Sequence, residues 1–335
     1  MSTARGAVLG SSAVPLVERY DAALLDLDGV LYLGDDPVPH AASAVAAARE
    51  AGVRLAYVTN NASRSPAAVA DKLTALDIPA APDEVVTSGQ AAARTLAAEL
   101  APGAAVLVVG TSALADEVAA VGLRPVRTVA EAGERGPAAV VQGLAPATTW
   151  SDLAEAAVAL HQGALWVAGN TDATLPTTRG PLPGNGAFVA ALRLVTGREP
   201  IVSGKPDPRL HLESVERVGA RRPLVVGDRL DTDVLGAVRG GADSLLVLTG
   251  VAGVRELLAA AVGSRPTFVS PDLRGLLEPH PQVEVDGETA RCGDAVACWA
   301  DGLLSGEAGT ADGVRALAAL AWSLADRGIP VRLAD

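Results

Sequence analysis

Short apolar runs alternate with longer alanine-rich segments along most of this chain, from Asp21 to about Leu277. The runs have the length of buried strands, and the alanine-rich segments carry their apolar residues at helical spacing. This alternation is typical of an α/β fold, in which helices cover both faces of a mainly parallel sheet. The predicted strands are residues 22–26, 54–58, 104–109, 138–142, 165–168, 224–226, 244–248 and 267–269. Between them, Ser88 is expected to cap a helix over residues 89–100, and Thr111 to begin a helix that stops at Gly122.

Polar side chains gather just after four of these strands, where open α/β sheets bind their ligands. The clusters are Asp26-Leu27-Asp28-Gly29, Thr59-Asn60-Asn61, Ser203-Gly204-Lys205-Pro206, and Gly227-Asp228 with Asp231 and Asp233. The stretch between the second and third clusters is far longer than one crossover needs, and it contains strands and helices of its own. We therefore predict a discontinuous core at residues 15–87 and 200–278, interrupted by an inserted α/β domain at residues 88–199. The Pro- and Gly-rich stretch 176–186 is expected to be a loop that leads back toward the core.

The last part of the chain, residues 279–335, departs from this pattern and is predicted to be a small α/β extension. We expect strands near residues 283–285 and 329–333, and helices near residues 294–304 and 311–325. Cys292 and Cys298 are the only cysteines, and they lack the further Cys or His ligands of a zinc site. They are expected to be free thiols in a reducing cytoplasm.

The charge of the chain limits what it binds. It has 39 acidic and 27 basic residues, a formal net charge of −12, and no run of basic residues. This acidic balance argues against sequence-independent binding to nucleic acid and against binding to an anionic membrane. No apolar stretch of about 18 residues occurs, so insertion into a membrane is not expected. Residues 6–17 lack a convincing signal-peptide cleavage site and are predicted to be a flexible leader.

The first and fourth clusters hold carboxylates. Asp26 and Asp28 are separated by one residue after the first strand, and Asp228 and Asp233 follow a later strand. Converging carboxylates repel one another, and a metal, a shared proton or a cation relieves that repulsion. A hard cation such as Mg²⁺ prefers oxygen ligands of this kind. Each Asp taken alone is more often a turn former or a helix cap, but that explanation is improbable at four strand ends together.

Lys205 stands out because the 27 basic residues include only two lysines, the other being Lys72. Lysine is usually a solvated surface residue, but a chain that uses Arg almost everywhere has no evident need for it on the surface. A nucleotide-binding Walker loop is excluded, since it would require Gly at Glu199 and Ser or Thr at Pro206. A compact ammonium suits a crowded site in which one point charge lies between carboxylates and a phosphate.

Thr59 and Asn60 bring a hydroxyl and an amide to the end of the second strand. Both groups can donate a hydrogen bond to an anionic oxygen. A polar turn, with Asn61 and Ser63 capping the next helix, explains the same residues equally well.

In this order, the four clusters resemble the four motifs of the haloacid dehalogenase superfamily of phosphatases. The long insertion is similar to the α/β cap of the NagD-like and p-nitrophenylphosphatase-like branch. The segments that also match this branch are Thr87-Ser88-Gly89, Gly169-Asn170-Thr171-Asp172 and Pro183-Gly184-Asn185-Gly186-Ala187. The resemblance covers about residues 20–278 and implies a Rossmann-like core with an inserted cap. A C-terminal extension is a further likeness to actinobacterial glycerol-phosphate phosphatases.

By this resemblance, Asp26 would be the nucleophile that forms an aspartyl-phosphate, and Asp28 would be the general acid and then the general base. The cofactor would be Mg²⁺, with Asp26, the backbone carbonyl of Asp28, Asp228 and Asp233 as ligands. The groups that would hold the phosphate are Thr59, Asn60 and Lys205, of which Lys205 also offsets its charge. The cap residues expected over the leaving group are Asn170, Thr171, Asp172 and Arg179.

The resemblance implies a cytoplasmic phosphomonoester hydrolase for a small phosphorylated metabolite, with glycerol 3-phosphate as the first candidate. Phosphoglycolate, pyridoxal phosphate and a nucleotide monophosphate are alternatives. A phosphomutase is a rival enzyme, and a phospho-ligand sensor or binding protein is a rival of another class. A homo-oligomer is compatible with the sequence. Because no pyrophosphate-binding loop follows Pro279, the extension is predicted not to bind acetyl-CoA.

Overall fold

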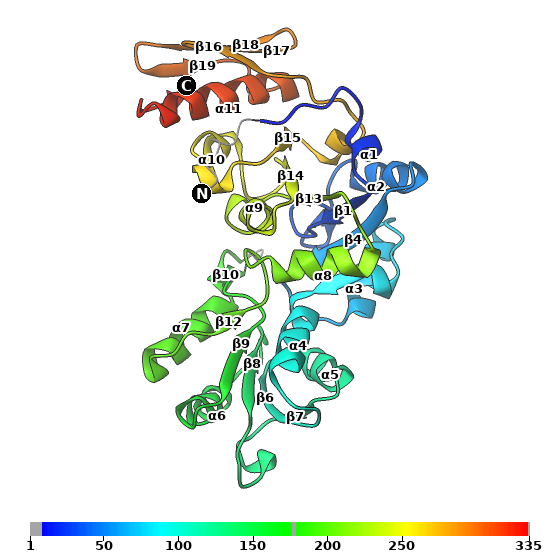
Figure 1. Cartoon of the computed structure of the whole chain (residues 1–335), viewed down its shortest axis with the longest axis vertical. Coiled ribbons are helices and arrows are strands. Elements are labelled where there is room, and N and C mark those ends of the chain that lie inside the picture. Colours follow the sequence, from blue (N-terminus) through cyan, green and yellow to red (C-terminus); the bar gives the residue numbers. More distant parts are fainter. Residues whose placement is uncertain (1–8, 176–178, 334–335) are drawn as a thin grey trace. The chain divides into compact units, whose positions relative to one another are not determined.

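The computed structural model describes residues 9–175 and 179–333, which belong to two compact units (Figure 1). The first unit comprises Met1–Tyr57, Ala75–Ile78 and Ser214–Asp335, and the second comprises Val58–Thr74 and Pro79–Glu213. The second unit contains the whole predicted insertion together with segments that flank it, and the C-terminal extension is part of the first unit. None of the helices in the described ranges is both long enough and apolar enough to cross a lipid bilayer.

Parallel strands form the sheet of the first unit, in the order β15-β14-β13-β1-β4 (Figure 1). The strands are β1 (Ala22–Leu25), β4 (Arg54–Thr59), β13 (Pro223–Gly227), β14 (Asp243–Val247) and β15 (Phe268–Ser270). β1 lies in the middle, where Ala22 is opposite Pro223 on one side and Arg54 on the other. All four residues of β1 are buried. A strand covered on both faces reads as an unbroken apolar run, which is why the sequence predicted these strands correctly.

Helices and short hairpins complete this part of the first unit. They are α1 (Leu16–Arg19), β2 (Tyr32–Leu33), β3 (Asp36–Pro37), α2 (Ala41–Glu50), α9 (Leu235–Gly240) and α10 (Val254–Leu258). The predicted flexible leader is wrong for residues 9–17. Ser12 forms an antiparallel bridge with His280, and Leu16 is fully buried at the start of α1. Residues 6–8 lie outside the described part of the chain.

The second unit is built around another parallel sheet, in the order β12-β9-β8-β6-β7. Its strands are β6 (Ala105–Val109), β7 (Arg124–Val126), β8 (Ala139–Gln142), β9 (Leu165–Ala168) and β12 (Ile201–Val202). Its helices include α3 (Pro66–Ala75), α4 (Ser88–Glu99), α5 (Ser112–Ala120), α6 (Trp150–His161) and α7 (Asn185–Thr196). α4 and α5 pack on one face of this sheet, and α6 and α7 pack on the other. Alternate residues of β6 point to the two faces, so this unit also has a buried α/β core.

Several local predictions need correction. Thr87, not Ser88, caps α4: its Oγ1 accepts a hydrogen bond from the backbone N–H of Gln90, and the Gln90 side chain accepts one from Thr87 in return. The strands β5 (Val85–Thr87), β7 and β12 were missed, because two or three residues are too few to show a period. The hairpin of β10 (Thr174–Leu175) and β11 (Leu182–Pro183) occupies part of the predicted loop 176–186, of which residues 176–178 lie outside the described ranges.

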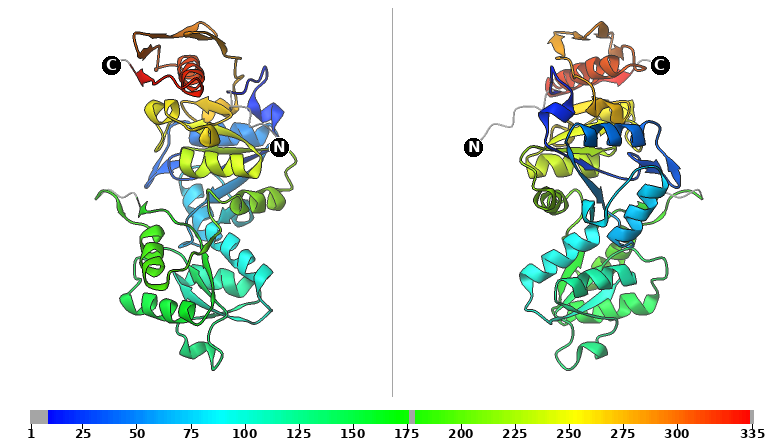
Figure 2. Two further views of the ribbon diagram at one scale, coloured as in Figure 1. Left: turned by 60° about the vertical axis from the view of Figure 1, so that its left-hand side comes forward. Right: turned by 90° about the vertical axis from the view of Figure 1, so that its right-hand side faces the viewer.

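The extension pairs a mainly antiparallel sheet with one long helix, α11 (Ala311–Asp326) (Figure 2). Its strands are β16 (Glu284–Asp286), β17 (Thr289–Cys292), β18 (Ala295–Ala300), β19 (Leu303–Ser305) and β20 (Arg332–Leu333). The predicted helix over residues 294–304 is wrong, since β18 and β19 form a hairpin there. Asp301 and Gly302 both have positive φ at its turn, and an Asp-Gly pair of this kind is a strong hairpin signal that outweighs the alanine-rich composition. Cys292 and Cys298 are free thiols, as predicted.

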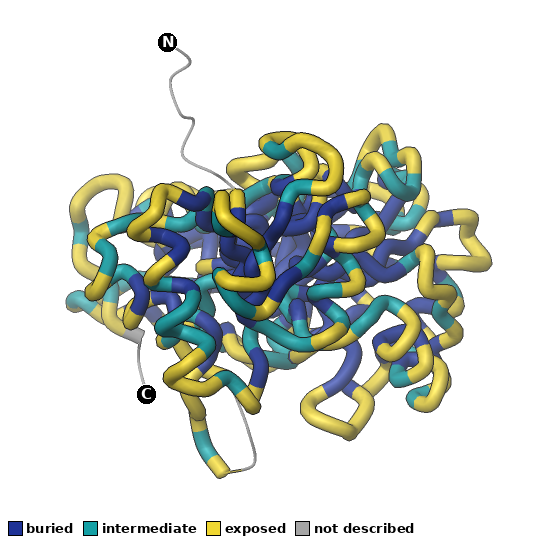
Figure 3. The backbone as a smooth tube through the Cα atoms, turned by 90° about the horizontal axis from the view of Figure 1, so that it is seen from below, coloured by how far each residue is buried: buried dark blue, intermediate teal, exposed yellow. Residues whose placement is uncertain are grey.

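α11 is buried on more than one side and joins the extension to the core sheet. One hydrophobic cluster contains Leu317, Leu320 and Trp322 of α11 together with Val234, Leu246 and Val269 of the core. The indole N–H of Trp322 donates to the carbonyl of Leu257 at 2.9 Å, and Arg265 binds both carboxylate oxygens of Asp326 at 2.7 and 2.8 Å. Figure 3 colours each residue by its burial, and many of the loops are exposed. The extension therefore shares the hydrophobic core of the first unit.

We expect Trp322→Ala to lower the free energy of unfolding by about 3–5 kcal/mol, because Trp322 is 2% exposed and its truncation leaves a cavity. Trp150→Ala is the matched control, since Trp150 is 82% exposed and should change stability by less than about 0.5 kcal/mol. Urea unfolding of both variants measures the difference. Equal effects would show that α11 does not share the core of the first unit.

A buried polar cluster links the extension to Gly275, near the end of the core. His280 Nδ1 lies 3.1 Å from the Arg315 guanidinium, and its Nε2 lies 2.8 Å from the carbonyl oxygen of Gly275. Arg315 also donates to Asp312 at 2.7 Å. Burial, with the positive charge of Arg315, lowers the pKa of His280 to about 4, although Gly275 and Asp312 act in the opposite direction. His280 is therefore neutral in the folded protein at pH 7.

This depressed pKa predicts a loss of stability in acid. Between pH 6.5 and about 4 the unfolded chain binds a proton on His280 and the folded chain does not, so protonation favours unfolding as the pH falls. His280 alone should lower the free energy of unfolding by at most about 1.4 kcal/mol per pH unit in this window. Urea titrations across it should show a smaller slope for His280→Gln than for the wild type. Identical slopes would contradict the assignment.

Candidate functional site

Three carboxylates converge in the first unit, at the ends of β1 and β13. Asp26, Asp228 and Asp233 each place one oxygen within 4.8 Å of the others, in the only group of this kind found among the described residues. Asp26 follows β1 directly and donates its backbone N–H to the carbonyl of Val226 in β13, at 2.9 Å. Asp228 and Asp233 are both 1% exposed. These three are among the four residues that the sequence predicted as metal ligands, and the structure brings their side chains together.

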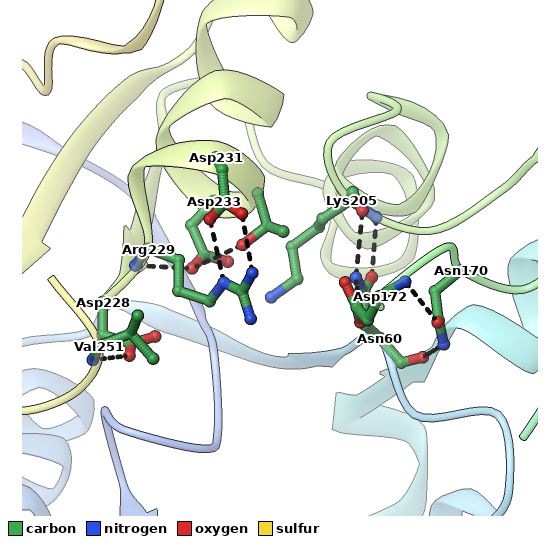
Figure 4. A network of polar contacts seen from close by, with 10 residues as sticks. Asn60, Asn170, Asp172, Lys205, Asp228, Arg229, Asp231, Asp233 and Val251 are labelled. Atoms are coloured by element: carbon green, nitrogen blue, oxygen red, sulfur yellow. Dashed lines mark hydrogen bonds and ion pairs between the residues drawn. The ribbon is translucent and has the colours of Figure 1, made fainter. Parts of the chain in front are cut away.

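The backbone after β13 positions the two buried carboxylates. Residues Leu230–Val234 form a single π-helical turn that runs into α9, a rare geometry that often marks functional sites. Asp233 Oδ2 accepts a hydrogen bond from the backbone N–H of Arg229 at 3.2 Å. Asp228 Oδ2 accepts one from the backbone N–H of Val251 at 2.6 Å (Figure 4). Backbone N–H groups therefore hold both carboxylates, and a backbone group is less mobile than a side chain.

Asp231, which the sequence grouped with them, points elsewhere. It is exposed and binds the Arg229 guanidinium at 2.8 and 3.0 Å (Figure 4). This hydrogen-bonded pair lowers the pKa of Asp231 below its usual value. Asp231 neutralises Arg229 and takes no part in the carboxylate group.

Glycines leave the room that the carboxylates occupy. A Cβ at Gly29 or at Gly250 would collide with the carboxylate of Asp228, and a Cβ at Gly227 would collide with the side chain of Asp233. Gly29 also has φ +87°, a conformation that favours glycine, and its carbonyl accepts a hydrogen bond from Thr249 at 2.6 Å. Thr249, Gly250 and Val251 were missed by the sequence analysis. They follow the end of β14, so the strand-end argument applied to one more strand would have found them.

The carboxylate group fits a hard divalent cation. All three available ligands are oxygens, which suits Mg²⁺ rather than zinc or copper. Two buried carboxylates with a third nearby repel one another unless a cation or a proton lies between them. The side chain of Asp28 is not a member of this group and is exposed. The role of its backbone carbonyl as a metal ligand stays a prediction.

In the second unit, Lys205 is almost completely buried, at 3% exposure. Its ammonium donates to the carbonyl of Val58, near the end of β4, at 3.2 Å. A lysine buried to this extent is not an ordinary surface charge. Thr59, the next residue, is 5% exposed, and its hydroxyl oxygen accepts a hydrogen bond from the backbone N–H of Asn61 at 3.1 Å. Accepting that bond leaves the hydroxyl hydrogen of Thr59 able to donate.

The side chain of Asn60 is used differently from the prediction. Its two amide hydrogens go to the carbonyl of Lys205 at 3.1 Å and to Asp172 Oδ2 at 3.2 Å (Figure 4). A primary amide has only two donor hydrogens. The predicted contact between this side chain and a phosphate therefore conflicts with the observed hydrogen bonds.

Two of the predicted cap residues, Asn170 and Asp172, are held by hydrogen bonds within the second unit. Asn170 is 5% exposed, donates to the carbonyl of Asn60 at 2.6 Å and accepts from the backbone N–H of Asp172 at 3.1 Å. Thr171 and Asp172 are half-buried, and Arg179 is exposed. Asn185 donates to the carbonyl of Asn170 at 2.7 Å, which explains why the Pro183–Ala187 segment belongs with this loop.

The chain is similar to known proteins over most of its length. Residues 23–124 match the haloacid dehalogenase-like hydrolases, and residues 202–276 match the HAD-hydrolase-like family. D-glycerol 3-phosphate phosphatase of Mycobacterium tuberculosis is 49% identical over 318 residues, which are 92% of this chain and 87% of that protein. The chain is a haloacid dehalogenase-like hydrolase.

Other relatives of this haloacid dehalogenase-like hydrolase are also phosphatases. The acid sugar phosphatase of Staphylococcus saprophyticus is 35% identical over 264 residues, which cover 78% of this chain and 98% of that protein. The crystal structure of glycerol phosphate phosphatase from M. tuberculosis in complex with magnesium has a TM-score of 0.82 and 45% identity, over 96% of this chain and 95% of that one. The p-nitrophenyl phosphatase of Archaeoglobus fulgidus has a TM-score of 0.71 and 30% identity, over 77% and 98%. The family and the α/β fold class predicted from the motifs are confirmed.

The glycines around Asp228 provide a test of the metal site. Gly250→Ala should weaken Mg²⁺ binding by about 10- to 100-fold, because the new methyl group displaces the Asp228 carboxylate. Gly263→Ala is the control, since nothing lies within 4 Å of a Cβ there. Isothermal titration calorimetry measures both affinities. Unchanged affinity in Gly250→Ala would exclude Asp228 as a ligand.

Proposed function

We propose that this hydrolase is a Mg²⁺-dependent phosphomonoester phosphatase that cleaves glycerol 3-phosphate. The carboxylate group of Asp26, Asp228 and Asp233 is the observation that carries the metal-dependent chemistry. The substrate is supported by the 49% identical relative named D-glycerol 3-phosphate phosphatase, whose similarity covers 92% of this chain and so reaches into the extension. The substrate class is a small phosphorylated metabolite.

Asp26 is the proposed nucleophile. Its carboxylate attacks phosphorus, the bond from phosphorus to the ester oxygen breaks, and an aspartyl-phosphate forms. Asp28 protonates the departing alkoxide and then takes a proton from the water that hydrolyses the intermediate. Asp28 is exposed, so it can exchange protons with solvent between turnovers. Phosphate leaves and Asp26 is regenerated.

The metal and the second-unit residues have electrostatic roles in this proposal. Bound Mg²⁺, with Asp26, Asp228, Asp233 and the backbone carbonyl of Asp28 as its proposed ligands, would neutralise charge on the phosphoryl oxygens. Thr59 and Lys205 are the proposed donors to those oxygens, and Lys205 adds a buried positive charge. The amide hydrogens of Asn60 are committed to Lys205 and Asp172 and are left out of this set.

Selection of the substrate is proposed to lie in the inserted cap, residues 88–199, because the core motifs address only the phosphate. Thr171, Asp172 and Arg179 are the proposed contacts to the leaving group. Asn170 is assigned to the structure of the loop, since its amide already binds Asn60 and Asp172. Sugar phosphates, phosphoglycolate, pyridoxal phosphate and nucleotide monophosphates are the comparison substrates. The cytoplasm is the proposed compartment.

Asp26→Asn should reduce phosphate release from glycerol 3-phosphate by at least about 10⁴-fold, because an amide is not a nucleophile for this step. Asp231→Asn is the matched control, since Asp231 pairs with Arg229 at the surface and should change the rate by less than about threefold. Phosphate release is measured for both variants, with and without EDTA. Metal-independent turnover, or turnover by Asp26→Asn, would contradict the mechanism. Transfer of the phosphate to a sugar without its release would indicate a mutase.

A further inference from the structure

The side chain of Asn60 forms a closed pair of hydrogen bonds with the backbone of one residue, Lys205. Asn60 Oδ1 accepts from the Lys205 N–H at 2.8 Å, and Asn60 Nδ2 donates to the Lys205 carbonyl at 3.1 Å. The amide thus binds both polar groups of the Lys205 main chain, as a neighbouring strand would. Its remaining hydrogen goes to Asp172 Oδ2 at 3.2 Å. One side chain therefore holds two loops that are far apart in the sequence.

The backbone of Asn60 is itself fixed. Its carbonyl accepts hydrogen bonds from Ser88 Oγ and from Asn170 Nδ2, both at 2.6 Å. Ser88 belongs to the first turn of α4, and Asn170 belongs to the same loop as Asp172. Because a helix start and a second loop restrain its main chain, the Asn60 amide has little freedom to follow Lys205 if that residue moves.

Glycines let these segments approach closely. A Cβ at Gly204, next to Lys205, would collide with the carbonyl oxygen of Gly169 and lie 2.6 Å from Asn60 Oδ1. A Cβ at Gly169 would lie 3.2 Å from Ser88 Oγ. The loop at Gly204 and the loop at Gly169 therefore approach each other so closely that only glycine fits at position 204.

We propose that Asn60 is a positioning residue, which fixes the main chain of Lys205 so that its buried ammonium keeps one direction, and which ties Lys205 to Asp172 in the cap loop. The proposal rests on the proposed function, in which Lys205 binds the phosphate and Asp172 faces the leaving group. A lysine has four rotatable side-chain bonds, so the place of its ammonium depends on a fixed backbone. A misplacement of about 1 Å in such a group can cost about 10²-fold in rate.

Asn60→Ala should therefore lower kcat/KM for p-nitrophenyl phosphate by about 10²-fold. Asn61→Ala is the matched control, because Asn61 Oδ1 also accepts two hydrogen bonds, at 2.6 and 2.7 Å, but both come from Ser63. Its kcat/KM should change by less than about threefold. Similar losses in the two variants, or no loss in Asn60→Ala, would overturn the proposal.

A double-mutant cycle separates positioning of Lys205 from a general structural effect. In a Lys205→Met background, Asn60→Ala should cost less than about threefold, because the ammonium that Asn60 positions is already gone. A structural role would give the same factor of about 10² in both backgrounds. That additive result would contradict the proposal.

Hydrogen exchange of the Lys205 amide tests the contact without any activity. Asn60→Ala removes the acceptor of this N–H. Its exchange should become at least about 10-fold faster than the change in global stability alone would make it, whereas Asn61→Ala should have no such effect. Unchanged exchange in Asn60→Ala would refute the positioning. If the wild-type protein released phosphate from no ester, the proposed function would fail, and the exchange result would still decide whether Asn60 fixes the Lys205 main chain.

Discussion

Electrostatic repulsion among three carboxylates is the constraint on which the catalytic unit depends. Asp26, Asp228 and Asp233 place oxygens within 4.8 Å of one another, and two of the three are almost fully buried. A flexible chain would separate these charges, so rigid elements have to hold them together. Two adjacent parallel strands, a π-helical turn and the Val251 N–H do so here. The same repulsion creates the affinity for a divalent cation on which phosphoryl transfer relies.

The C-terminal extension contributes to this rigidity. α11 shares a hydrophobic cluster with Val234, which follows Asp233 in the chain, and Trp322 binds the carbonyl of Leu257 in α10, the helix that follows the Val251 loop. Residues added beyond the sheet therefore pack against the turn that carries Asp233 and against α10, which follows the loop that binds Asp228. This packing gives the extension a structural role that requires no ligand of its own.

The hydrolase illustrates which local signals can be trusted. The central strands were predicted because burial on both faces makes them continuous apolar runs, as in β1 and β6. The hairpin of β18 and β19 was read as a helix, because alanine favours helices and the Asp301-Gly302 turn was given no weight. Thr249, Gly250 and Val251 were missed because the strand-end argument was not applied to β14, although these residues follow that strand directly.

The sequence by itself determined the order of the motifs, the α/β fold and the family, and it named the three carboxylates that the structure brings together, because strand ends in a parallel sheet bring such residues to one edge. The tertiary structure decided how each side chain is used. It placed Asp231 on Arg229, away from the other carboxylates, and the Asn60 amide donates its hydrogens to Lys205 and Asp172. A motif states which donors and acceptors are available, but their partners depend on loops that meet only after folding.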